Sequence, residues 1–368
     1  HVPSNKEDYP ADQTTFYGLL RDAGYHVTGC GKFDLNKGEQ KWGLDGAYKL
    51  DEWGFTSGIN NAGKWDAIIG SKDGPADPYM KYLYDNELDT MHKEDFQARR
   101  GGDRGNYTVT APTPLPEHAY CDNWEAANAI KLLGQIPENT PWFIQVNFSG
   151  PHPPVDITKR MDAACRGMKQ PAAHKNTQLP DETHTRVREN YSAMTENIDR
   201  LASEIIAAVD ARGELDNTII IFSSDHGEML GDHDLWGKKH PYEASVGVPL
   251  IIAGPEFAQG RRSDALVDIM DLAATCLTAA ELPVPEDMDS RTLIPCLRDD
   301  EPAHRDHIIS ALGDWQAVRD TRYKLVRGFP EKESLALYDL ANDPNEDANI
   351  AADHPDVVAR LQALLPVV

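Results

Sequence analysis

The sequence predicts an α/β fold, with a mostly parallel central sheet covered by helices on both faces. A small C-terminal antiparallel sheet and a closing helix follow it. Helical patterns and short apolar strands alternate from residue 14 to residue 280, which is typical of a parallel sheet packed between helices. After about residue 305 the chain becomes short strands separated by turn residues. We therefore expect an α/β domain over residues 1–300 and an α+β subdomain over residues 301–368.

The elements of the α/β region follow from hydrophobic spacing and from the residues that end each run. We expect helices over residues 14–23, 123–133, 187–213 and 267–280. The apolar runs at 25–29, 141–148, 217–223 and 249–253 predict strands, the last three of the buried type found in parallel sheets. Residues 34–118 are expected to form an excursion of loops and short helices, and residues 155–185 to be irregular.

The C-terminal region has a different pattern. Short apolar runs at 307–310, 315–319, 323–326 and 335–339 predict the strands of the antiparallel sheet. Residues 354–365 predict the closing helix.

Composition and charge exclude several classes of protein. The chain has 368 residues, 36 Lys+Arg against 60 Asp+Glu, and a formal net charge of −24. Such a charge argues against a nucleic-acid partner, and an anionic substrate would need a local cluster of cations or a metal. The longest apolar run is far shorter than the ~20 residues that span a bilayer. We expect no membrane span, and the oligomeric state and the compartment stay open.

Charged or polar residues follow three of the predicted strands. These are Lys32 after Gly31, His152 after Gly150-Pro151, and the Asp225-His226 pair before Gly227. Ligands of parallel sheets gather beyond the carboxyl ends of the strands, so these three segments and a fourth, residues 231–243 with Lys238, are expected to converge on one edge of the sheet. Taken singly, each also has an ordinary explanation as a solvated charge or a loop residue. A carboxylate beside an imidazole is the strongest signal, because it suits a divalent metal.

These segments, in this order, resemble the sulfatase family of the alkaline phosphatase superfamily. The similar stretches are residues 19–25 with 31–32, 150–154, 191–199 with 213 and 217–218, 222–233, 236–238, 242–243, 248–251, 319–325 and 337–344. The resemblance implies a sulfuric ester hydrolase (sulfatase) that attacks a sulfate ester with a formylglycine hydrate. It also implies a divalent metal, calcium first, with Mg2+ or Mn2+ as alternatives. The substrate would be a small-molecule or saccharide sulfate ester.

The resemblance also implies a role for particular residues. Asp225 and His226 match one pair of metal ligands, and Lys32 and Lys238 match the two lysines that contact the sulfate or its leaving group. His152 matches the histidine of the same site. Sulfate transfer builds negative charge on oxygens, which cations neutralise and a histidine protonates. His233 and His240, which flank Lys238, are candidates for supporting roles.

Two departures from the family pattern stand out. The family commonly has a histidine two residues after the first lysine, and here that position is Asp34, a candidate relay residue. The family's first two metal-binding aspartates and its Cys/Ser-x-Pro-x-Arg nucleophile segment have no match in this sequence. We expect both to lie upstream of residue 1, and the 368-residue chain alone to be inactive.

Two alternatives to an active sulfatase stay open at this point. A phosphodiester or phosphonate monoester hydrolase of the same superfamily would share the metal ligands. A truncated, non-catalytic relative would share the fold without the nucleophile. The substrate cannot be assigned, although Trp42, Trp53 and Trp65 are candidates for stacking on a sugar or aryl ring, with a place in the core as the other interpretation.

Overall fold

The computed structural model describes residues 7–100, 106–175, 178–298 and 303–366. The chain forms two compact units, one of residues 1–171 and 181–215 and the other of residues 172–180 and 216–368. The predicted domain boundary between residues 300 and 301 falls outside the described ranges and stays a prediction.

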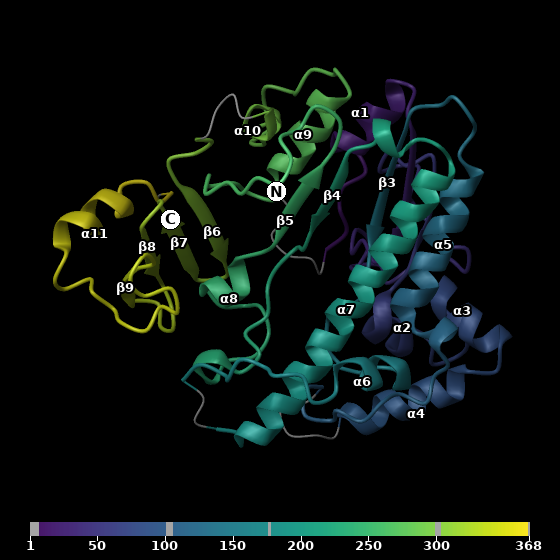
Figure 1. Cartoon of the computed structure of the whole chain (residues 1–368), viewed down its shortest axis with the longest axis horizontal. Coiled ribbons are helices and arrows are strands. Elements are labelled where there is room, and N and C mark those ends of the chain that lie inside the picture. The colour runs from purple at the N-terminus through teal and green to yellow at the C-terminus, as the bar shows by residue number, and fades with distance from the viewer. Residues whose placement is uncertain (1–6, 101–105, 176–177, 299–302, 367–368) are drawn as a thin grey trace. The chain divides into compact units, whose positions relative to one another are not determined.

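The first unit is built on a three-stranded parallel sheet with the strand order β2-β1-β3 (Figure 1). Its strands are β1 (His26–Gly31), β2 (Ser57–Asn60) and β3 (Trp142–Asn147). Its helices are α1 (Phe16–Asp22), α2 (Gly63–Gly70), α3 (Pro78–Asp85), α4 (Asp89–Arg100), α5 (Cys121–Gln135), α6 (Lys159–Cys165) and α7 (Asp181–Ala211), with a 3-10 turn, η1 (Glu117–Ala119). A second 3-10 turn, η2 (Leu215–Asn217), leads to the next unit.

Helices cover both faces of this sheet, as the sequence predicts. On one face, Phe143 of β3 meets Phe16 of α1 edge-on, with ring centroids 5.6 Å apart. On the other face, Cys30 of β1 packs against Ala129 and Leu132 of α5. Alternating side chains of a strand point to opposite faces, so each strand contributes to both layers of the core.

The second unit contains an antiparallel pair, β4 (Ile220–Ser223) and β5 (Leu250–Ala253). The expectation of buried parallel strands was wrong here, because a four-residue apolar run carries no information about strand direction. The pair is also only partly buried, and Ile251 is 64% exposed. The same unit contains η3 (Asp232–Asp234), α8 (Glu243–Val246), α9 (Asp271–Ala279) and α10 (Ile294–Arg298).

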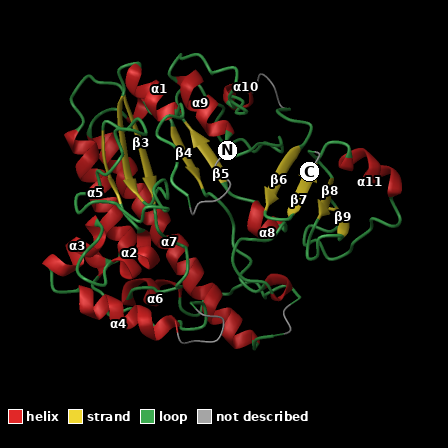
Figure 2. Ribbon diagram, turned by 180° about the vertical axis from the view of Figure 1, so that it is seen from behind, coloured by secondary structure: helices red, strands yellow, loops and turns green. Residues whose placement is uncertain are grey.

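The C-terminal sheet confirms the predicted antiparallel arrangement. Its strands β6 (Ile308–Leu312), β7 (Trp315–Arg319), β8 (Tyr323–Arg327) and β9 (Leu335–Asp339) lie in chain order. Figure 2 shows the closing helix α11 (Pro355–Gln362) beside these strands. Leu361 of α11 and the following Leu365 pack on Val318, Leu325 and Leu337 of the sheet.

Residues 34–118 hold β2 as well as the expected short helices, and residues 155–185 hold α6 and the start of α7. The strand and α6 were missed because each is too short to show a period. Among the described residues, no helix has the length and apolar character needed to cross a bilayer.

The junction between β1 and β3 offers a direct test of this fold. Gly31 has a φ of 113°, and a Cβ added there would lie 2.0 Å from the carbonyl oxygen of Asn147. We expect Gly31→Ala to lower the free energy of unfolding by about 2–4 kcal/mol, measured by urea denaturation. The matched control is Gly134→Ala in α5, where a Cβ meets nothing within 4 Å. It should raise stability by up to about 1 kcal/mol, and equal effects of the two changes would contradict the close approach.

Candidate active site

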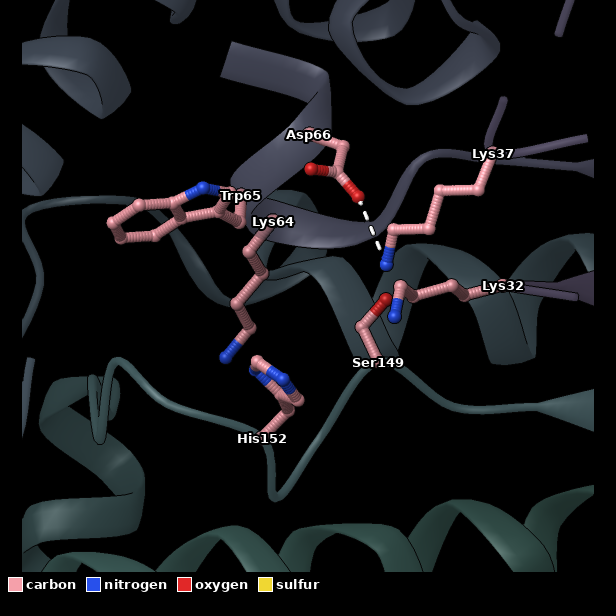
Figure 3. A pocket seen from close by; sticks show the side chains of 7 residues that line it. All are labelled: Lys32, Lys37, Lys64, Trp65, Asp66, Ser149 and His152. Carbon is pink, nitrogen blue, oxygen red and sulfur yellow. Dashed lines mark ion pairs between the residues drawn. The ribbon is translucent and has the colours of Figure 1, made fainter. Parts of the chain in front are cut away.

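A pocket in the first unit collects cationic side chains from three segments that are distant in sequence. The segments are the end of β1, the start of α2 and the loop after β3. Figure 3 shows the lining residues, which are Lys32, Lys37, Lys64, Trp65, Asp66, Ser149 and His152. Lys32 and His152, predicted from separate motifs, therefore lie in one pocket.

Lys32 is held where the sheet ends. Its backbone N–H donates to the carbonyl of Asn147 over 3.0 Å, which extends the pairing of β1 with β3. A Cβ at Gly63, the first residue of α2, would lie 2.6 Å from Cδ of Lys32. The glycine therefore leaves the room that the Lys32 side chain occupies.

Asp34 bridges two of the lysines. Its Oδ2 lies 3.0 Å from Nζ of Lys32 and 3.1 Å from Nζ of Lys37, which also pairs with Asp66 at 3.2 Å. Burial raises the pKa of Asp34, but the Lys32 and Lys37 charges outweigh it and hold the pKa below its usual range. Burial acts to lower the pKa of Lys37, but Asp34 and Asp66 raise it overall. Asp34 is thus an ionised bridge between cations, and its predicted relay role stays a prediction.

Lys64 is the most enclosed cation of the pocket, with its residue only 5% exposed. Its Nζ lies 2.8 Å from Oδ1 of Asp156 and donates to the Tyr120 hydroxyl, also over 2.8 Å. Burial acts to lower the pKa of Lys64, but the nearby carboxylates, Asp156 foremost, raise it overall. Lys64 therefore keeps its charge, and that charge is largely balanced inside the protein.

The loop that carries His152 is fixed by two buried carboxyl groups of α5. Gly150 N–H donates to Oδ1 of Asp122 over 2.6 Å, and Ser149 donates to Glu125 through its N–H (2.8 Å) and its hydroxyl (2.7 Å). His152 itself is exposed, and its Nδ1 lies 2.7 Å from the carbonyl oxygen of Pro153. If Nδ1 donates its proton to this carbonyl, Nε2 is the ring nitrogen that remains to exchange a proton with a ligand.

In the second unit, Asp225 and His226 follow β4 directly, as predicted. The Asp225 side chain is 81% exposed, and its Oδ2 lies 3.3 Å from Nε2 of His226. Nδ1 of His226 lies 2.7 Å from the Gly227 carbonyl oxygen, and a proton donated there leaves the lone pair on Nε2. A carboxylate oxygen and an imidazole lone pair at this spacing suit a divalent cation, although they supply only part of a coordination shell.

The segment after this pair carries the remaining predicted residues. Lys238 is half-buried, and its carbonyl accepts a hydrogen bond from the Ser245 hydroxyl over 2.7 Å, whereas Lys239 is exposed. His240 Nε2 lies 3.2 Å from the Trp236 carbonyl oxygen. These contacts fix the backbone around Lys238.

His233 lies apart from these contacts, since its Nε2 lies 2.8 Å from the carbonyl oxygen of Asn345. The structure thus brings Lys32 and His152 together in one unit, and Asp225 and His226 together in the other. The convergence of all five residues, Lys238 included, on one cleft stays a prediction.

Comparison with known proteins assigns the family. The model of the family described as "Sulfatase" matches residues 2–282. The chain belongs to the sulfatase family. A second model, "N-sulphoglucosamine sulphohydrolase, C-terminal", matches residues 231–366.

Individual relatives support the same assignment. An arylsulfatase of Clostridium perfringens is 24% identical over 92% of this chain and 74% of its own length. Matches to vertebrate arylsulfatase K proteins from Xenopus laevis, Bos taurus and Gallus gallus cover 49% of this chain and only 36% of theirs. The sequence comparisons support a hydrolase of the sulfatase family.

Solved structures share the fold at low sequence identity. One, in complex with its substrate D-glucosamine-2-N,6-O-disulfate, has a TM-score of 0.74 and 19% identity over 99% of this chain and 83% of the other. A phosphonate monoester hydrolase from Silicibacter pomeroyi has a TM-score of 0.76 and 20% identity over 98% of this chain and 80% of the other. These likenesses establish the architecture of this sulfatase-family chain.

Sequence reasoning missed several residues of the pocket of this sulfatase-family chain. Four of the lining residues belong to no motif: Lys37, Lys64, Asp66 and Ser149. Only Lys37 could have been suspected from the sequence, because it is a second lysine close after Asp34. Of the three candidate tryptophans, Trp65 lines the pocket, whereas Trp42 and Trp53 are each 1% exposed and belong to the core.

The buried carboxyls under the histidine loop predict a pH-dependent stability. Burial, and then the charge of Asp122, raise the pKa of Glu125 from 4.5 to about 8. Between those values the folded protein keeps a proton that the unfolded chain has lost, so stability should fall as pH rises from about 5 to 8.

Glu125→Gln should remove this loss of stability between pH 5 and pH 8. Chemical denaturation at pH 5 and pH 8 should show a smaller decrease for the variant, by on the order of 2–4 kcal/mol. Glu138→Gln, at an exposed position after α5, is the matched control and should behave as the wild type. An unchanged pH dependence in Glu125→Gln would disprove the role of this carboxyl.

Proposed function

We propose that this chain belongs to a sulfuric ester hydrolase and supplies the groups that bind the sulfate ester. The observation that carries the proposal is the pocket of the first unit, where Lys32, Lys37, Lys64 and His152 gather in a chain of net charge −24. A local group of cations is what an anionic substrate needs in order to approach such a protein. Membership of the sulfatase family supports sulfate as the anion.

The proposed roles follow from the chemistry of each side chain. Lys32 offers a compact positive charge to non-bridging sulfate oxygens, and Asp34 keeps its ammonium in place at 3.0 Å. His152, if Nδ1 is tied to the Pro153 carbonyl, donates a proton from Nε2 to the leaving oxygen. Lys238 stabilises the charge that develops on the leaving group.

Asp225 and His226 are the proposed metal ligands. Their donor atoms, a carboxylate oxygen and an imidazole nitrogen 3.3 Å apart, fit a divalent ion. We expect calcium, with Mg2+ or Mn2+ as alternatives, and the bound ion would polarise the sulfate oxygens. The nucleophile, a formylglycine hydrate made from a cysteine or serine, is proposed to lie on a segment before residue 1.

The proposed substrate is a small-molecule or saccharide sulfate ester. Trp65 lines the pocket beside the lysines and offers an aromatic face on which a sugar or aryl ring could stack. A structural relative binds a disulfated glucosamine, which is compatible with this class. No nucleic-acid partner is proposed.

A phosphonate monoester hydrolase is the second candidate, since one such enzyme shares this fold with a TM-score of 0.76. The two activities are separated by kcat/KM on an aryl sulfate and on an aryl phosphonate monoester. We expect the formylglycine-containing full-length protein to prefer the sulfate by at least about tenfold, a difference of roughly 1.4 kcal/mol in transition-state binding. A preference for the phosphonate would establish the alternative.

The same assay has two internal controls. Lys32→Ala should lower kcat/KM for the preferred ester by about 30- to 1000-fold, whereas Lys41→Ala, at an exposed position outside the pocket, should change it only a few-fold. The 368-residue chain without the nucleophile segment should show no formylglycine-type turnover. Robust hydrolysis by that chain would show that the nucleophile is misassigned.

The two adjacent lysines of the second unit give the sharpest test of the proposed register. Adjacent residues of an extended loop point in roughly opposite directions, so only one of them is expected to meet the substrate. Lys238→Ala should lower kcat/KM on an aryl sulfate by about 30- to 1000-fold, or 2–4 kcal/mol. Lys239→Ala, at the exposed position, should change it only a few-fold. A large loss of kcat/KM in Lys239→Ala and a small one in Lys238→Ala would show that the proposed assignment of the active lysine is wrong by one residue.

A further inference from the structure

A second cluster of metal-ligating side chains lies in the second unit, and the proposed reaction uses none of its members. One ring nitrogen each of His174 and His233 and a carboxylate oxygen of Asp347 all lie within 4.8 Å of one another. The three residues come from three segments that are far apart in sequence. His174 and His233 line a pocket together with Asp232, Tyr242, Glu243, Ala244, Pro344, Asn345 and Glu346, and Asp347 directly follows the last of these in sequence.

Backbone N–H groups join the segments of His174 and His233 and shape the turn that carries Asp347 before any ligand arrives. The N–H of His174 donates to the Asp232 carboxylate over 2.7 Å, and the N–H of His233 donates to the His174 carbonyl over 2.8 Å. The N–H of Asp347 donates to the Asp343 carboxylate over 2.9 Å. Preorganised ligands lower the entropic cost of binding an ion.

A backbone carbonyl can fix the tautomer of His233. Its Nε2 lies 2.8 Å from the carbonyl oxygen of Asn345, so donation there leaves the lone pair on Nδ1. The ring also stacks on Tyr242, with centroids 4.4 Å apart and planes within 7°. Histidines that bind metals characteristically donate their second ring N–H to a carbonyl or carboxylate, which fixes the tautomer and the ring plane.

We propose that His174, His233 and Asp347 form a site for a transition-metal ion of the zinc class. Two imidazoles and one carboxylate are a ligand set suited to Zn2+, with water in the fourth position. The same set suits calcium poorly, because calcium prefers six or more oxygens. The ion would link the segment around His174 to the turn around Asp347.

The ligand-free arrangement must open slightly to admit the ion. Nε2 of His174 lies 2.6 Å from Oδ1 of Asp347, whereas two ligands of a tetrahedral zinc are about 3.3 Å apart. Lys175 also pairs with Oδ1 of Asp347 at 2.9 Å and so competes with the ion. Its Nζ donates to the Asp347 carbonyl over 2.9 Å as well, and that contact survives when the carboxylate turns to the metal.

The test measures Zn2+ binding by the full 368-residue chain in which Asp225→Ala and His226→Ala remove the proposed catalytic ligands. We expect one Zn2+ per chain after gel filtration, counted by elemental analysis, with the affinity measured against a chromophoric chelator. His174→Ala and His233→Ala should each weaken binding by about 10- to 100-fold or more. His118→Ala, which removes an exposed histidine of the first unit, is the matched control and should change nothing.

Lys175→Gln separates a metal site from a simple ion-pair contact. Removing the competing ammonium should tighten Zn2+ binding, whereas weaker binding would overturn the assignment. Unchanged Zn2+ affinity in His233→Ala, or no stoichiometric Zn2+ in the parent protein, would overturn it as well.

If a histidine variant does not fold, Co2+ in the parent protein decides the question. Intense visible absorption, as given by four-coordinate cobalt, supports the site, and the weak bands of six-coordinate cobalt refute it. These results are independent of sulfatase activity, so the site and the proposed function fail separately.

Discussion

The carboxyl group of Glu125 is the contact on which the first unit's pocket depends. It is fully buried and receives hydrogen bonds from Asn61 Nδ2 (2.9 Å) and from both the N–H and the hydroxyl of Ser149. Asn61 in turn accepts from the N–H of Gly63 over 2.7 Å at the start of α2. One side chain of α5 thus positions the helix that carries Lys64 and the loop that carries His152. An unpaired buried polar group is costly, so each of these partners constrains the others.

The pocket keeps its cations by pairing each lysine with a carboxylate. Asp34 pairs with both Lys32 and Lys37, and Asp66 pairs with Lys37. Asp156 pairs with Lys64. Desolvating an isolated ammonium would cost several kcal/mol, and these partners offset that cost before any substrate is present. They also reduce the net positive charge that an arriving anion meets. If the pocket binds the proposed sulfate ester, the sulfate oxygens would replace carboxylate contacts to these lysines.

Most of the fold could be predicted from the sequence because its long elements have clear periods. The helix α7 and the four C-terminal strands are examples, whereas β2 and α6 are too short to show a pattern. The antiparallel pairing of β5 with β4 could not be predicted, since strand direction depends on tertiary contacts. In the site, Lys32 and His152 belong to motifs that end strands. Lys64 and Asp66 reach the pocket because the start of α2 lies close to the Lys32 side chain, a tertiary contact that no local pattern encodes.

The two histidine-containing donor sets of the second unit illustrate how the backbone selects chemistry. In both, one ring nitrogen lies 2.7–2.8 Å from a carbonyl oxygen, Gly227 for His226 and Asn345 for His233. Each carbonyl favours the tautomer that leaves a lone pair on the other nitrogen, Nε2 in His226 and Nδ1 in His233. As the proposed calcium ligands, Asp225 and His226 would leave most of a coordination shell to oxygen ligands, which suits a hard cation. In the proposed zinc-class site, a second imidazole at His174 would shift the preference toward zinc-like ions, so ligand number and type would distinguish the two proposed sites.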